Sequence, residues 1–197
     1  MNTTDTTSMQ ETRTLRVFLT RGVLAIAWAA VFAATADSLT VGVGVLLVLY
    51  PLIDAVATLL DARTQHGSAR RLLLANAALS TLAAVALGVA ATGSIANVIA
   101  VFGVWALVSG AAQLATAVRR RAQLGKQWPM RLAGGVSVVI GVAFLAASTG
   151  ADPKLSMLAI YAATGGADFV IQAWLLARRR RQTVNTPLRD ATPAPQS

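Results

Sequence analysis

The sequence contains no cysteine and one histidine, His66. The lack of cysteine excludes disulfides, thiolate catalysis and cysteine-ligated metal sites. A single histidine in a polar segment supplies neither the ligand set of a metal site nor the embedded base of a serine–histidine dyad. We therefore expect no enzyme: no catalytic residue, no bound metal and no cofactor.

Charge is also scarce. Charged residues make up 13% of the 197 residues, against about a quarter in soluble domains. Hydrophobic residues make up 55% and gather in six long apolar stretches. A membrane-spanning helix needs about 20 mostly apolar residues, so six of them occupy most of the chain. The sequence therefore predicts an all-α, polytopic membrane protein with six transmembrane helices.

The basic residues alternate with loops that carry almost no charge. The chain has 17 Lys/Arg residues, and all except Lys154 fall into four clusters: Arg13, Arg16 and Arg21; Arg63, Arg70 and Arg71; Arg119 to Arg121, Lys126 and Arg131; and Arg178 to Arg181 with Arg189. Short loops rich in Lys/Arg stay in the cytoplasm, so both termini are expected there. The net charge of +9 then indicates anionic headgroups of the inner leaflet as partners, and no nucleic acid.

The apolar stretches define the expected domain organisation. Spans are predicted at about 15–34, 39–60, 71–91, 95–118, 128–147 and 154–177. Residues 15–181 form the membrane domain, between a disordered N-terminus (1–14) and a disordered tail (182–197). The intervening segments 35–38, 92–94 and 148–153 are turn-sized, so each pair of spans is expected to form a tight hairpin.

The first span allows a second interpretation. Ala34-Thr35-Ala36 has the A-x-A form of a signal-peptidase site, and basic residues precede the apolar stretch. Cleavage there would leave the orientation of the other spans unchanged. Against cleavage, the apolar stretch is long for a signal peptide, and its loss would break an internal repeat.

That repeat is visible without gaps. Residues 99–121 align with residues 158–180, so that Phe102 matches Tyr161 and Gln113 matches Gln172. Residues 41–63 follow the same plan. The chain is therefore predicted to hold three tandem helical hairpins (about 15–63, 71–121 and 128–180) in parallel orientation, unlike the inverted repeats of many transporters.

Each of the three tandem hairpins ends in an apolar span with Gly or Asp, followed by an arginine cluster. This pattern resembles the HdeD-type acid-resistance membrane proteins, which are built from a short repeat of unknown function. The resemblance covers about residues 15–181. It implies a multi-pass protein of the bacterial inner membrane, linked in some members to acid stress. It implies no enzymatic activity and no catalytic residues.

Charges inside the spans are costly and therefore candidates for function. Arg21 and Asp54 each lie about six residues, or roughly 9 Å, from the inner ends of their spans, and an ion pair would lower the cost of both. Arg131 and Asp168 hold similar places in the third hairpin, and Asn76 and Ser109 in the second. Two interpretations stay open, besides simple snorkelling of the arginines. The pairs are structural clamps, or the two aspartates line a polar cavity and titrate.

Small residues and one proline complete the expectations. Gly134, Gly135, Gly141, Gly165 and Gly166, with Ala25, Ala29 and Ala33, suggest seams of close helix packing. Pro51 is expected to free a backbone carbonyl near Leu47.

Three hypotheses of function follow: a stress or envelope protein of HdeD type; a small transporter, channel or proton-responsive protein using Asp54 and Asp168; or an assembly subunit docked on a membrane-protein partner or on a second copy.

Overall fold

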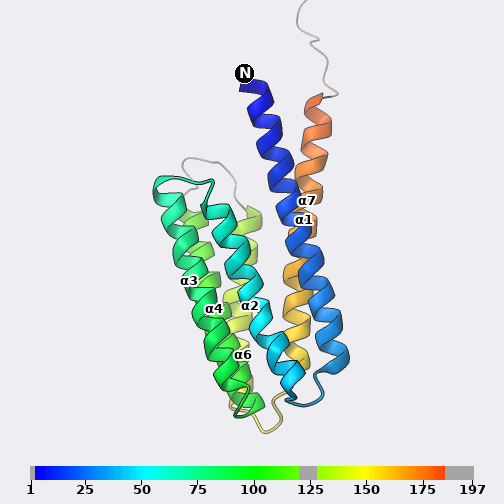
Figure 1. Ribbon diagram of the computed structural model, residues 1–197, viewed down its shortest axis with the longest axis vertical. Coiled ribbons are helices and arrows are strands. Elements are labelled where there is room, and N and C mark those ends of the chain that lie inside the picture. Colours follow the sequence, from blue (N-terminus) through cyan, green and yellow to red (C-terminus); the bar gives the residue numbers. More distant parts are fainter. Residues whose placement is uncertain (1–2, 120–127, 185–197) are drawn as a thin grey trace, which may run out of the picture.

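A computed structural model describes residues 3–119 and 128–184, which form six helices (Figure 1). They are α1 (Thr3–Thr35), α2 (Val41–Ala62), α3 (Gly67–Ala90), α4 (Ile95–Arg119), α6 (Trp128–Ser148) and α7 (Ser156–Val184). All six are long and apolar enough to cross a membrane. The all-α fold of six spans predicted from the sequence is confirmed.

The helix ends differ from the prediction at both termini. Helix α1 begins at Thr3, so residues 3–14 are helical where the sequence predicted disorder. Polar composition indicated disorder there, but adding residues to a helix that the apolar span has already nucleated costs little. Helix α7 continues to Val184, and the rest of the predicted tail lies outside the described residues.

The two ends of the bundle differ in charge. Helices α1 and α7 have their free ends on the same side as the α2–α3 turn (Figure 1). Arg63 and Arg70 lie at that turn, and we call this side the basic end. The connections α1–α2, α3–α4 and α6–α7 lie at the opposite side, which we call the short-loop end.

The outer surface of the bundle is apolar. Large hydrophobic side chains are exposed on every helix, among them Val23 at 59%, Leu82 at 68% and Ile160 at 66%. Between 22% and 44% of each apolar span is buried inside the protein. A soluble protein rarely exposes so much contiguous apolar surface, whereas lipid tails accept it.

The helices pack most closely in pairs that the sequence did not predict. The most extensive contacts join α4 with α6, α1 with α7, and α2 with α3, whereas α1–α2, α3–α4 and α6–α7 touch much less. The expectation of tight packing within each hairpin is therefore wrong. The second helix of each repeat packs on the first helix of the next repeat, and the last helix closes on the first.

Glycines explain the closest of these pairs. A Cβ atom on Gly110 would lie 2.8 Å from the carbonyl oxygen of Gly134, and one on Gly103 would lie 3.0 Å from that of Gly141. The two contacts are seven residues apart on each helix, so they recur along one face after two helical turns. Only glycine allows the α4 and α6 backbones to approach this closely.

The α1–α7 pair is also packed through facing glycines. Gly22 and Gly166 face each other, and a Cβ atom on either would lie 2.9 Å from the carbonyl oxygen of the other. Three of the predicted seam residues, Gly134, Gly141 and Gly166, are thus used inside the chain. Gly135 differs, because no described atom outside its own helical turn lies within 4 Å of the position its Cβ would take.

Aromatic side chains fill the centre, where the three helix pairs meet. Phe102 contacts Tyr50, Trp105, Phe144 and Tyr161, with ring centroids 5.2–5.9 Å apart. Trp28 and Phe32 extend this cluster onto α1. Such ring pairs contribute about 0.5–1.5 kcal/mol each beyond their buried area. Beyond the cluster, the α1–α7 pair diverges from the other four helices toward the basic end (Figure 1).

Two neighbouring glycines test the packing of α6. We expect Gly134→Ala to lower the free energy of unfolding by about 1–3 kcal/mol, because its Cβ would lie 2.9 Å from backbone atoms of Gly110 and Leu114. The matched control Gly135→Ala should be neutral or slightly stabilising, since its Cβ meets open space. Denaturant titration in detergent micelles measures both changes. Equal effects of the two variants would contradict the α4–α6 packing described here.

Candidate functional site

The ion pair predicted between the first two spans is present. A guanidinium nitrogen of Arg21 on α1 donates to Asp54 Oδ1 on α2. The Arg21 guanidinium also lies over the ring of Phe169, 4.8 Å from its centroid, in a cation–π contact. The side chains of Arg21 and Asp54 are 21% and 23% exposed, so the pair is largely but not fully enclosed. Since α1 packs mainly on α7, the pair links two helix pairs.

The second carboxylate oxygen of Asp54 is satisfied by α3. Asp54 Oδ2 accepts from Asn76 Nδ2 at 3.1 Å and from Ser80 Oγ at 2.8 Å. The amide of Asn76 also reaches Thr58 Oγ1 at 3.3 Å, and Trp105 Nε1 on α4 donates to Ser80 Oγ at 3.2 Å. Asp54 is therefore the hub of a polar network that joins α1, α2, α3 and α4.

The sequence identified only part of this network. Arg21, Asp54 and Asn76 were predicted candidates, whereas Ser80, Thr58 and Trp105 were missed. Helical spacing offered a signal, because Asn76 and Ser80 are four residues apart, as are Asp54 and Thr58, and residues so spaced share a helix face. No pattern in the sequence indicates that α2 packs on α3, and this packing brings the two faces together.

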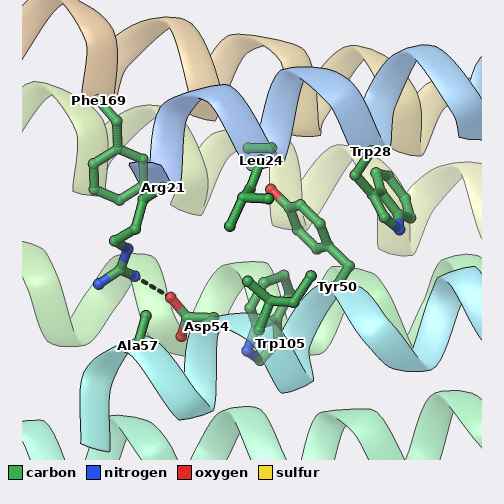
Figure 2. A pocket seen from close by; sticks show the side chains of 10 residues that line it. Arg21, Leu24, Trp28, Tyr50, Asp54, Ala57, Trp105 and Phe169 are labelled. Carbon is green, nitrogen blue, oxygen red and sulfur yellow. Dashed lines mark hydrogen bonds and ion pairs between the residues drawn. The ribbon is translucent and has the colours of Figure 1, made fainter. Parts of the chain in front are cut away.

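A small cavity adjoins the ion pair (Figure 2). Its volume is about 60 Å³, and its lining includes Arg21, Asp54, Tyr50, Trp28 and Trp105. This volume has room for about two water molecules. No hydrogen bond to the Tyr50 hydroxyl occurs among the described residues. The cavity thus places polar groups of α1 and α2 beside a space large enough for water.

Trp28, which lines the cavity, also bonds to the backbone of α2. Trp28 Nε1 donates to the carbonyl oxygen of Leu46 at 2.8 Å. Pro51 is buried within α2. Because proline has no backbone N–H, the carbonyl of Leu47 has no hydrogen-bond donor at position 51, and Leu47 directly follows Leu46. The contact of Trp28 lies beside the turn where the sequence predicted a freed carbonyl.

The second predicted ion pair does not form. Arg131 is exposed on α6, and no ion pair of Arg131 occurs within the described ranges. Asp168 instead accepts from Gln172 Nε2 on its own helix at 2.5 Å. Helices α6 and α7 touch even less than α1 and α2 do, because α6 packs on α4 and α7 packs on α1. The predicted Arg131–Asp168 clamp is therefore wrong.

Ser109 and Asp168 lie apart from the network. Ser109 is buried and donates to the carbonyl of Ala106 in its own helix at 3.3 Å. The same carbonyl accepts from Ser137 Oγ at 3.0 Å, and Ser137 is also 2.7 Å from the Tyr161 hydroxyl. Asp168 does not line the cavity beside Asp54. The two aspartates therefore do not share one cavity, contrary to the titrating-cavity interpretation.

The arrangement around Asp54 acts first as a clamp. Both carboxylate oxygens have partners, and the one cationic partner among the described residues, Arg21, lies on a different helix pair. Removing one member of an enclosed pair leaves the other uncompensated, which costs more than the pair itself contributes.

Two matched aspartate variants test this clamp. We expect Asp54→Asn to lower the free energy of unfolding by about 1.5–3 kcal/mol, because Arg21 loses its counter-charge. Asp168→Asn should change it by less than about 1 kcal/mol, since Asp168 has no ion pair in the described part of the chain. Unfolding in detergent measures both, and adding Arg21→Gln to Asp54→Asn should recover part of the loss. An equal loss for both aspartates would contradict the clamp.

A protein-family model matches the middle of the chain. The model of a family described as a short repeat of unknown function (DUF308) matches residues 76–146. The match runs from Asn76 in α3 through α4 to Ala146 in α6 and covers just over a third of the chain. DUF308 is the family of the HdeD-like proteins. Comparisons with curated proteins and with solved structures give no match. The middle of this chain is thus similar to a DUF308 repeat, in agreement with the repeat read from the sequence.

Proposed function

We propose that this chain is a non-enzymatic, multi-pass protein of the bacterial inner membrane that acts in stress or envelope physiology, as HdeD-type proteins do. The observation that carries the proposal is the DUF308 match within a bundle of six apolar helices. The basic clusters favour a cytoplasmic location of both termini.

The polar network supports a structural rather than a chemical use of Asp54. Its two oxygens accept from Arg21, Asn76 and Ser80, so three of the roughly four acceptor sites of the carboxylate hold neighbouring helices together. A general base must lie within hydrogen-bond reach of the proton it removes. This arrangement fits a protein whose role depends on the integrity of the bundle.

Survival under stress tests this role. We expect a strain that lacks the gene to survive acid or envelope stress less well than its parent, and a plasmid copy to restore survival. A copy carrying Gly134→Ala should restore less than one carrying Gly135→Ala, because only the former disturbs the bundle. Equal survival of the deletion strain and the parent under acid, osmotic and detergent stress would overturn the proposal.

A second candidate function is a response to protons, or their transport. The cavity of about 60 Å³ beside the Arg21–Asp54 pair favours it, since water there would give Asp54 a route for proton exchange. Protonation of Asp54 would remove the counter-charge of Arg21 and weaken the link between α1 and α2. This candidate uses Asp54 alone, because Asp168 lies elsewhere.

Proton flux into proteoliposomes distinguishes a structural role of Asp54 from a role in proton transport. If Asp54 relays protons, Asp54→Asn should reconstitute at normal yield but lose proton flux under an imposed pH gradient, while Asp168→Asn keeps it. If Asp54 is only a clamp, yield falls and the protein that is recovered shows no flux difference from wild type. A wild-type protein that gives no flux above empty vesicles would exclude the second candidate.

A further inference from the structure

Helix α6 carries a second concave surface, which shares no lining residue with the cavity beside Asp54. This groove has a volume of about 380 Å³, and the described residues that line it lie on α6: Arg131, Leu132, Gly135, Val136, Val139 and Ile140. These residues alternate with those that face α4, such as Gly134 and Gly141. The groove therefore lies on a part of α6 that the α4 contact leaves uncovered.

The shape of the groove depends on Gly135. Apart from the adjacent residues and backbone of its own helix, no atom of the described residues lies within 4 Å of the position a Cβ at Gly135 would take, so the missing side chain leaves a depression between its neighbours. Leu132, Val136 and Val139 around it are 57%, 45% and 68% exposed. The few contacts between α6 and α7 leave this face accessible from the membrane. An apolar ligand can lie here without displacing another part of the described chain.

One end of the groove is cationic. Arg131 lies at the basic end of the groove, is exposed, and forms no ion pair among the described residues. Its counterpart in the first repeat, Arg21, is paired with Asp54. The guanidinium of Arg131 is therefore free to donate hydrogen bonds to an anion, and phosphate matches its planar geometry.

The length of the groove matches one leaflet of a bilayer. Arg131 and Ile140 are nine residues apart, which is about 13.5 Å along a helix. Half of a hydrocarbon core of about 30 Å is roughly 15 Å. A chain that begins at Arg131 would therefore end near the middle of the membrane.

We propose that this groove binds one anionic phospholipid from the leaflet at the basic end, with the phosphate on Arg131 and one acyl chain along Leu132, Gly135 and Val139. Arg131 lies at the basic end, where the phosphate of such a lipid would be, and the apolar lining extends from it toward the middle of the membrane, where the acyl chain would be. A free phosphate would use the arginine and leave the groove unused. The inference depends on the chain spanning a membrane and is independent of its role in stress.

Native mass spectrometry of the detergent-solubilised chain, titrated with phosphatidylglycerol or phosphatidylcholine, tests the site. We expect Arg131→Gln to weaken phosphatidylglycerol binding about fivefold and to leave phosphatidylcholine binding unchanged. Gly135→Leu should weaken both lipids, because its side chain fills the depression.

Two controls match these variants. Arg70→Gln removes another exposed arginine at the basic end, on α3, and Gly42→Leu adds a leucine at an exposed position of α2, where the nearest atom to its Cβ is a Thr40 oxygen at 3.8 Å. Neither should change lipid binding. Should Gly135→Leu fail to fold, the smaller Gly135→Val replaces it, with the unfolding midpoint as the check.

Three results would overturn the inference. The first is wild-type affinity for phosphatidylglycerol in both Arg131→Gln and Gly135→Leu. The second is a loss in Arg70→Gln as large as in Arg131→Gln, which would indicate diffuse attraction to the basic end. The third is a loss in Arg131→Gln alone together with full competition by inorganic phosphate, which would indicate a simple anion site.

Discussion

Close contact between glycine backbones is the constraint on which the rest of this bundle depends. Lipid tails are as apolar as leucine, so helices in a membrane gain little from burying apolar side chains against one another and depend on close packing instead. Here Gly103 and Gly110 on α4 meet Gly141 and Gly134 on α6, and Gly22 on α1 meets Gly166 on α7. These contacts join two of the three helix pairs, and the pairing in turn decides which polar side chains can meet.

The outcome for the intramembrane charges follows from this pairing. Arg21 and Asp54 form an ion pair although α1 and α2 touch little, because the long arginine side chain crosses from one helix pair to the next. Asp54 gains Asn76 and Ser80 because α2 packs directly on α3. Arg131 and Asp168 form no such contact, because α6 and α7 touch even less than α1 and α2 do. Arg131 is exposed on α6, and Asp168 accepts from Gln172 within its own helix.

Much of the fold was predictable from the sequence, and the packing was not. Apolar length and arginine clusters located six helices, and the costly charges Arg21 and Asp54 pointed correctly to each other. The turn-sized loops were misleading, because a short connection fixes where two helix ends lie and leaves open which faces touch. The glycines of α6 show the remaining difficulty. Gly134 and Gly135 are adjacent and alike in sequence, yet one contacts the α4 backbone and the other meets open space.

The internal repeat therefore gives equivalent residues different surroundings. Arg21 and Arg131 hold similar places in the first and third repeats, but Arg21 lies against Phe169 and Asp54 inside the bundle, while Arg131 is exposed at the edge of a groove. Burying an arginine in the membrane without a counter-charge costs free energy. An arginine at this position of the repeat therefore needs either a carboxylate such as Asp54 beside it or access to the membrane surface. In the second repeat this position is Asn76. Its neutral side chain needs no counter-charge and no access to the membrane surface, and it donates a hydrogen bond to Asp54. One position thus supplies a clamp, a neutral support and a cation facing the membrane, depending on which helix pair its neighbours form.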